Sequence, residues 1–320
     1  MRAGAASLPK SGNILFTVVG GYLGSGKTTL LNYVLRHAGG RRIGVIVNDF
    51  GGINIDASLI ERREEDMVNL ANGCVCCSIS AGFAEALARL AQRTNPPEHV
   101  IIEASGVADP VRVGYFGSMP PYRLDGVVVL ADAETIRERA LDKYVGSAVL
   151  RQLRGADLVV LNKVDLVSEA ERTALGTWLS GEVPGARIFP TSHGRVPLAV
   201  LLGVHGAACV PGESHDGGHD HGEEYASRSV TMDTPLGEAA FRASVAEWPG
   251  SVLRAKGIVY LADDKLHRYV FQLVGRRWSL TQDRLWRSDP PRTELVLIGL
   301  ACQIDGETLL AGLEAAKAGA

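Results

Sequence analysis

The sequence predicts a doubly wound α/β domain with a mostly parallel sheet, followed by a smaller α+β domain. Five short runs of aliphatic residues in the first two thirds of the chain are almost purely apolar, as strands buried on both faces of a parallel sheet are. Helical patterns separate these runs, and this alternation is typical of doubly wound folds. The runs are Ile14–Val19, Ile43–Val47, Val100–Ile102, Val127–Leu130 and Leu158–Leu161.

The helical patterns between these runs have clear ends. Thr28–His37 is followed by a glycine pair at 39 and 40, and Phe83–Arg93 stops before a proline pair at 96 and 97. Glycine readily leaves the helical conformation and proline cannot donate a backbone hydrogen bond, so both terminate helices.

A polar segment divides the chain. Residues 205–228 are rich in Gly, His, Asp and Glu, which is typical of an exposed linker. We therefore expect a first domain over residues 1–203, a linker over 204–228 and a C-terminal domain over 229–320. The strands and helices expected in the last domain are Gly257–Leu261, Tyr269–Val274, Leu295–Leu300, Glu238–Trp248 and Glu307–Lys317.

The composition excludes several classes of protein. The 320 residues are 46% hydrophobic and 22% charged, so the chain is neither disordered throughout nor fibrous. A net charge of −3 argues against broad binding to nucleic acid or to an anionic membrane. No apolar run reaches the roughly 18 residues of a membrane span, and Ile14–Val19 is too short for a signal-peptide core. We expect a cytoplasmic protein without a membrane partner.

The strongest motif is a phosphate-binding loop. Residues 21–28 read GYLGSGKT and fit G-x-x-x-x-G-K-[ST] between a predicted strand and a predicted helix. Glycines let backbone N–H groups turn toward phosphate oxygens, Lys27 reaches the β- and γ-phosphates, and the Thr28 hydroxyl binds Mg²⁺. The residues expected to contact nucleotide here are Gly21, Gly24, Ser25, Gly26, Lys27, Thr28 and Thr29.

A second motif indicates the base. Asn162, Lys163 and Asp165 form N-K-x-D directly after the strand Leu158–Leu161. A carboxylate at Asp165 can accept from N1–H and the 2-amino group of guanine, whereas adenine offers no such pair of donors. Polar residues after a strand are also common turn formers, but downstream of a P-loop the motif favours GTP. Ser192 is a further candidate for contacting the base.

Two acids are candidates for Mg²⁺ and for the attacking water. Glu103 follows Val100–Ile102, and Asp49 follows Ile43–Val47. Mg²⁺ prefers one or two carboxylates together with phosphate oxygens and water, so Thr28, Asp49 and Glu103 are its expected ligands. Either acid could instead cap a turn. Lys27, Asp49 and Glu103 are the expected catalytic residues, with Asp49 as the candidate to activate water.

Three cysteines fall within four positions. Cys74, Cys76 and Cys77 follow Asn72 and Gly73, so they are predicted to lie in a loop. Thiolates are soft ligands that bind Zn²⁺, Cu(I) or Co²⁺. A buried apolar cluster or a redox disulfide between Cys74 and Cys77 is the alternative, although no thioredoxin-like context surrounds the pair.

Two further tracts have two interpretations each. The linker histidines His215, His219 and His221 could gather metal or could belong to a solvated polar segment. The stretch Arg276–Arg292, with five arginines, Trp278 and Trp286, could bind a partner or nucleic acid. Strand aromatics with charged outward neighbours explain it more simply.

Together these motifs make the sequence resemble the CobW family of metal-handling P-loop GTPases, relatives of the urease and hydrogenase nickel-insertion GTPases. The resemblance continues into the C-terminal domain and covers nearly the whole chain. One difference lies after the second strand, where many such members carry glutamates and this chain has Asp49 and Gly52. The motifs are GYLGSGKTTL (21–30), NDFGGINID (48–56), GCVCC (73–77), EASG (103–106), NKVD (162–165), RAKG (254–257) and LVLIG (295–299).

The resemblance implies a GTPase that binds Zn²⁺ or Co²⁺ at Cys74, Cys76 and Cys77 and delivers it to a client metalloprotein. The hypothesis from the sequence is therefore a GTP- and Mg²⁺-dependent metallochaperone that releases its metal on hydrolysis. Two rivals remain open. A non-catalytic metal buffer would bind metal equally well after Lys27→Ala, and an RNA- or ribosome-associated GTPase would be stimulated by RNA and indifferent to zinc. The negative net charge counts against a nucleic-acid partner, and the oligomeric state is not predicted.

Overall fold

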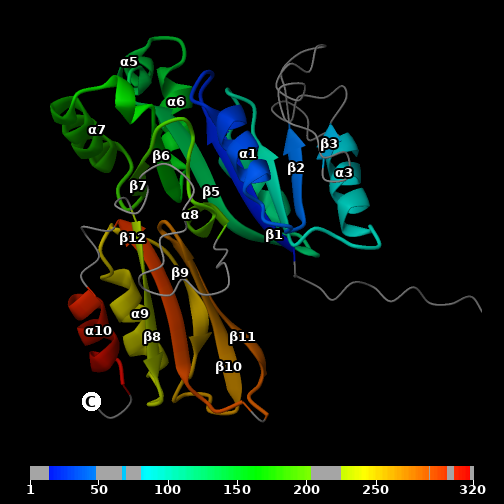
Figure 1. Cartoon of the computed structure of the whole chain (residues 1–320), viewed down its shortest axis with the longest axis vertical. Helices are drawn as coiled ribbons and strands as arrows, with labels where there is room; N and C mark the ends of the chain where they lie inside the picture. The colour runs from blue at the N-terminus through cyan, green and yellow to red at the C-terminus, as the bar shows by residue number, and fades with distance from the viewer. Residues whose placement is uncertain are drawn as a thin grey trace, which may run out of the picture. The chain divides into compact units, whose positions relative to one another are not determined.

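The computed structural model describes residues 14–47, 67–69, 81–202, 225–287, 289–300 and 306–317. Two compact units make up the chain (Figure 1). The first comprises Met1–Pro184 and Pro190–Leu198, and the second Gly185–Phe189 and Ala199–Ala320, so the division falls within one strand. No helix among the described residues is long and apolar enough to cross a membrane.

The first unit is built on a seven-stranded sheet of order β3-β2-β4-β1-β5-β6-β7. β1 pairs in parallel with β4 and β5, β2 with β3 and β4, and β5 with β6. This confirms the doubly wound, mostly parallel prediction. The strands are β1 (Ile14–Gly21), β2 (Ile43–Val47), β3 (Met67–Asn69), β4 (His99–Glu103), β5 (Tyr122–Asp132), β6 (Leu158–Asn162) and β7 (Arg187–Pro190).

Helices connect the strands, and several begin with side-chain caps. α7 starts with a capping box in which Ser168 and Glu171 exchange hydrogen bonds, and Asp109 caps α4 ahead of Pro110. The helices are α1 (Lys27–Arg36), α3 (Ala81–Ala91), α4 (Pro110–Gly114), α5 (Ile136–Leu141), α6 (Gly146–Arg154), α7 (Glu169–Glu182) and α8 (Leu198–Leu202), with 3-10 turns η1 (Tyr115–Ser118) and η2 (Val164–Leu166).

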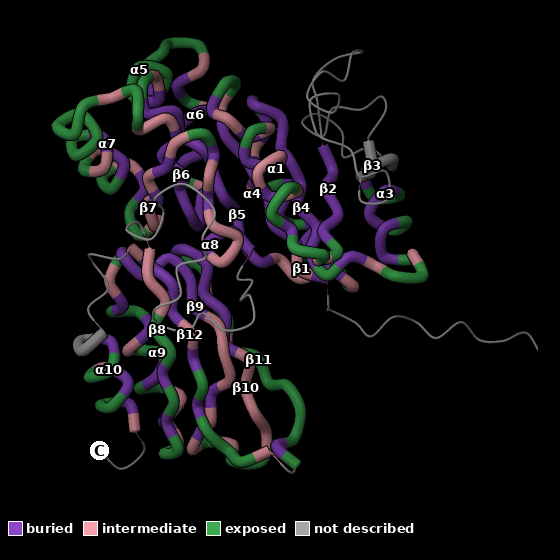
Figure 2. Tube along the Cα trace, viewed as in Figure 1, coloured by how far each residue is buried: buried purple, intermediate pink, exposed green. Residues whose placement is uncertain are grey.

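The strand register gathers polar side chains at one edge of this sheet. Val19 of β1 lies opposite Glu103, the last residue of β4, and Asp132 of β5 lies opposite Asn162 of β6. Parallel strands end at the same edge, so these three polar residues flank the loop that leaves β1. β2, β4 and β6 are buried along their whole length, as their apolar sequences predict (Figure 2).

The second unit contains an antiparallel sheet of order β11-β10-β9-β12-β8 and, besides most of α8, the helices α9 and α10. Its core brings α9 and α10 together with the sheet, and Phe271 makes edge-to-face contacts with Phe241 and Trp248. The elements are β8 (Tyr225–Met232), α9 (Glu238–Ala246), β9 (Val252–Val259), β10 (His267–Val274), β11 (Arg277–Leu285), β12 (Thr293–Leu300) and α10 (Gly306–Ala315).

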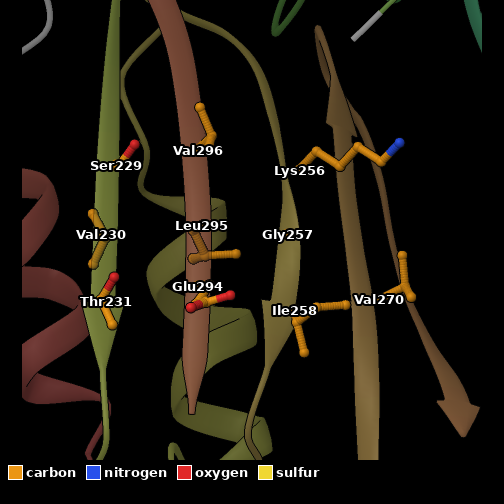
Figure 3. A pocket seen from close by; sticks show the side chains of 10 residues that line it. All are labelled: Ser229, Val230, Thr231, Lys256, Gly257, Ile258, Val270, Glu294, Leu295 and Val296. Carbon is orange, nitrogen blue, oxygen red and sulfur yellow. The ribbon is translucent and has the colours of Figure 1, made fainter. Parts of the chain in front are cut away.

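An open pocket of about 520 Å³ lies on this sheet (Figure 3). Two cross-strand rows contribute to it. Lys256, Val296 and Ser229 form one row, and Ile258 and Glu294 belong to the next.

One sequence-based boundary needs correction, and one interpretation is confirmed. The linker predicted over 204–228 is wrong at its end, because β8 begins at Tyr225 and pairs with β12 from Leu300 onward. In this edge strand residues 225–227 are half-buried and Arg228 is exposed, so their sequence resembles that of a polar linker. β11 occupies much of Arg276–Arg292, with a charged, exposed outer side and Trp278 packed against the core. This confirms the strand interpretation for that part of the segment.

Substitution of Gly257 should destabilise the second unit. A Cβ at this position would clash with the Glu294 carbonyl and lie 2.8 Å from Leu295 Cα, both rigid backbone of the neighbouring strand. Gly257→Ala is expected to lower the free energy of unfolding by ~1–3 kcal/mol in chemical denaturation. Gly237→Ala is the control, since its Cβ would meet nothing closer than 3.9 Å and should cost less than ~1 kcal/mol. Equal effects of the two substitutions would contradict this packing.

Candidate nucleotide-binding site

The loop between β1 and α1 has the backbone conformation of a phosphate cradle. Gly21, Gly24 and Gly26 all have positive φ, at 135°, 80° and 99°, which residues with a Cβ rarely adopt. A Cβ at Gly21 would lie 2.6 Å from the Leu130 carbonyl oxygen, so this loop is also packed closely against β5. Gly21 is therefore required for two separate reasons, whereas Gly24 has no atom within 4 Å of a Cβ and is required for its backbone conformation alone.

Two polar side chains of this loop are buried in it. The Lys27 ammonium group donates to the carbonyl oxygens of Gly21 at 2.9 Å and Tyr22 at 3.4 Å, so it lies across the mouth of the loop. The Ser25 hydroxyl is buried and has no hydrogen-bond partner among the described residues. A buried hydroxyl and a cation beside glycine N–H groups fit the oxygens of a phosphate chain.

Asn162 ties the phosphate loop to a second loop. Its Nδ2 donates to the Ser25 carbonyl oxygen at 2.9 Å, and its Oδ1 accepts from Gly194 N, also at 2.9 Å. Gly26 must be glycine beside it, because a Cβ there would clash with Asn162 Nδ2. Gly194 is equally constrained, since its Cβ would lie 2.9 Å from Leu30 N in α1. Asn162, predicted from the sequence to belong to the nucleotide site, therefore joins two loops through two backbone groups.

Lys163 is held by an acid at the end of the neighbouring strand. It has a positive φ of 64°, and its Nζ lies 2.6 Å from Asp132 Oδ2. The second oxygen of Asp132 accepts from Glu134 N at 3.0 Å, which fixes the carboxylate. This half-buried ion pair sets the direction of the Lys163 side chain beside the loop.

Asp165 lies at the same edge, in η2. The Ser192 hydroxyl holds the pKa of Asp165 below its ordinary value, and the charges of His193 and Lys163 act in the same direction, whereas burial opposes them. His193 Nε2 is 3.9 Å from Asp165 Oδ2. Asp165 is therefore ionised throughout the neutral range, as a carboxylate that accepts two hydrogen bonds from guanine requires.

The residues predicted to bind Mg²⁺ partly lie together. Glu103 is 2% exposed, and its strand ends beside β1 where the phosphate loop begins. Thr28 is the second residue of α1 and half-buried. A carboxylate and a hydroxyl next to a phosphate cradle are a donor set that suits Mg²⁺. Thr29 is exposed.

Several predicted site residues lie outside the described part of the chain. They are Asp49, the cysteines Cys74, Cys76 and Cys77, and the linker histidines His215, His219 and His221. No group of three or more potential metal-binding side chains occurs among the residues that are described.

Sequence reasoning missed two contributors to the site. Asp132 ends β5 just as Glu103 ends β4, so a carboxylate at a strand end was the available signal. The turn at His193 and Gly194 has positive φ at both residues, 55° and 63°, and places Ser192 beside Asp165. A His-Gly pair after a short strand is a turn signal, but it does not indicate a base contact.

Removal of the Asn162 amide should weaken the site and the fold together. Asn162→Ala leaves the buried Ser25 carbonyl and Gly194 N–H without this partner, so the free energy of unfolding should fall by ~1–3 kcal/mol. Affinity for GTP should fall as well, because both loops lose their common anchor. Denaturation and calorimetry measure the two effects, with Ser180→Ala on exposed α7 as the control. Unchanged GTP affinity would contradict the positioning role.

Comparisons with known proteins agree with this geometry. Residues 15–190 match the family model "CobW/HypB/UreG, nucleotide-binding domain", and residues 225–317 match "Cobalamin synthesis protein cobW C-terminal domain". The zinc chaperone CobW of Sinorhizobium sp is 32% identical over 90% of this chain and 93% of its own length. The zinc chaperone YjiA of Escherichia coli is 30% identical over 90% and 94%.

Among solved structures, the Zn(II)-bound YjiA GTPase from E. coli matches with a TM-score of 0.46 and 25% identity, over 95% of this chain and 99% of that one. The resemblance inferred from the motifs is confirmed by the two family models and by the relatives that match nearly end to end. This chain belongs to the CobW/HypB/UreG family and is a P-loop GTPase.

Proposed function

We propose that the chain is a GTP-dependent metallochaperone that binds Zn²⁺ or Co²⁺ through Cys74, Cys76 and Cys77 and passes it to a client metalloprotein. The observation that carries this proposal is that Asn162 joins the phosphate loop to the loop that contains Ser192 and Gly194. In the same chain the cysteine motif lies between β2 and β4. The names of the relatives, zinc chaperones, support the choice of cargo.

The described residues divide the work on GTP between them. The glycine loop and Lys27 bind the triphosphate, while Asp165 accepts from the guanine edge, with its carboxylate held by a hydrogen bond from Ser192. Thr28 and Glu103 would hold Mg²⁺, which supplies positive charge against the phosphate oxygens. In hydrolysis a water oxygen bonds to the γ-phosphorus and the bond to the β–γ bridging oxygen breaks, leaving GDP. Asp49 remains the candidate for receiving the proton of that water.

Coupling to the metal follows from the position of the cysteines in the chain. The cysteine motif lies in the chain between β2, which Asp49 follows, and β4, which Glu103 ends, so ordering of the segment around Asp49 by GTP and Mg²⁺ would also act on the metal ligands. Metal would be held with GTP and released with GDP. Thermodynamic linkage then requires bound metal to raise the affinity for GTP by the same factor by which bound GTP raises the affinity for metal.

Calorimetry of GTP binding with and without bound metal tests this coupling. With Mg²⁺ present, stoichiometric Zn²⁺ or Co²⁺ should raise GTP affinity by about fivefold or more. Cys76→Ala should abolish the effect, because it removes one thiolate of the site. Cys209→Ala, a cysteine outside the motif, should preserve it.

Three results would contradict the proposal. Equal GTP affinity with and without either metal would leave a GTPase with an independent thiolate site. Unchanged metal affinity in Lys27→Ala with GTP present would indicate a metal buffer. Hydrolysis stimulated by RNA but not by zinc would favour an RNA-associated GTPase.

A further inference from the structure

The segment after β4 is held from the side of α6 by one buried amide. Gln152, 3% exposed, points from α6 toward residues 103–108. Its Nε2 donates to the carbonyl oxygen of Gly106 at 3.0 Å and to that of Ala108 at 2.8 Å. Both hydrogens of the amide are therefore used on backbone that is more than forty residues away in sequence.

The same segment touches the phosphate loop. A Cβ at Gly106 would lie 2.7 Å from Leu23 Cδ2 and 3.0 Å from Leu23 N, so Gly106 is pressed directly against that loop. Ala104 N donates to the Val19 carbonyl at 2.8 Å, which continues the β1–β4 ladder into the segment. The segment is thus confined between the phosphate loop and Gln152.

The position of α6 is itself fixed, so Gln152 is a rigid anchor. Gly155, directly after α6, approaches α4 so closely that a Cβ there would lie 2.5 Å from Val111 Cγ2. Val149 and Leu153 are buried on the same side of α6 as Gln152.

The hydrogen bonds from Gln152 also set the direction of two backbone N–H groups. A trans peptide points its N–H opposite to its C=O, so fixing the carbonyls of Gly106 and Ala108 directs the N–H groups of Val107 and Asp109 away from Gln152.

We propose that Gln152 is a positioning residue for the GTPase reaction, which holds the Gly106–Ala108 backbone in the conformation that accommodates a γ-phosphate. The inference rests on the proposed function, because it assigns the segment after Glu103 to the part of the site that distinguishes GTP from GDP. GDP lacks the group that this backbone would face, so its affinity should not depend on Gln152. A buried glutamine that served packing alone would affect both nucleotides equally.

The test compares Gln152→Met and Gln152→Glu with wild type. Met keeps the length without donors, and Glu places a carboxylate oxygen against two carbonyl oxygens. Both variants should bind a non-hydrolysable GTP analogue about tenfold more weakly, equivalent to ~1.4 kcal/mol. Both should also hydrolyse GTP with a kcat about tenfold lower, while GDP affinity stays within about twofold. Arg151→Ala, exposed on the same helix, is the control and should match wild type.

The outcomes separate this role from the proposed function. Equal losses for GDP and the GTP analogue, or no loss for either, would overturn the positioning role even if the variants melt at a lower temperature. If wild type binds nucleotide but does not hydrolyse GTP, hydrolysis in the proposed function fails, and the affinity comparison still decides the role of Gln152. A variant that fails to fold shows itself by its melting curve, and the milder Gln152→Met then decides the question.

Discussion

The geometry of the nucleotide site depends on the side chain of Asn162, a buried amide that acts as donor to one loop and acceptor to another. A primary amide offers both functions at one position, so it can satisfy the Ser25 carbonyl and the Gly194 N–H together. Neither loop could approach so closely without glycine, since Gly26 and Gly194 have no room for a Cβ. The two loops are consequently placed relative to one another by β6, where Asn162 ends the strand.

The polar residues that end the parallel strands each have a different place in the candidate site. Glu103 ends β4 beside the phosphate loop, Asp132 ends β5 and holds Lys163, and Asn162 ends β6. The parallel sheet brings these residues to one edge although they lie far apart in sequence. Gln152 adds a fixed point on the helical side, so the backbone after Glu103 is held from two directions. The loop that follows β7 is thus held by the Asn162 amide, and the backbone proposed to face the γ-phosphate is held by the Gln152 amide.

The sequence predicted the first unit well because its strands are buried on both faces. The run Ile43–Val47 coincides with β2, the motif at 21–28 lies between β1 and α1 as predicted, and the motif at 162–165 begins at the end of β6. β8 and β11 were harder to place, because edge strands expose polar side chains that look like linker or surface. Gln152 carried no signal, since a polar residue in a helical pattern is expected to face solvent. Only the tertiary approach of α6 to the segment after β4 gives it a partner.

Base recognition is the part of this account that can be tested most directly. Affinities for GTP, ITP and ATP should be compared for wild type and Asp165→Ala. ITP lacks the 2-amino group, so wild type should bind it about tenfold more weakly than GTP, through the loss of one hydrogen bond to a charged acceptor. ATP should bind more weakly still, and Asp165→Ala should bring the three affinities close together. If wild type bound ATP as tightly as GTP, the loops joined by Asn162 would not form a guanine site.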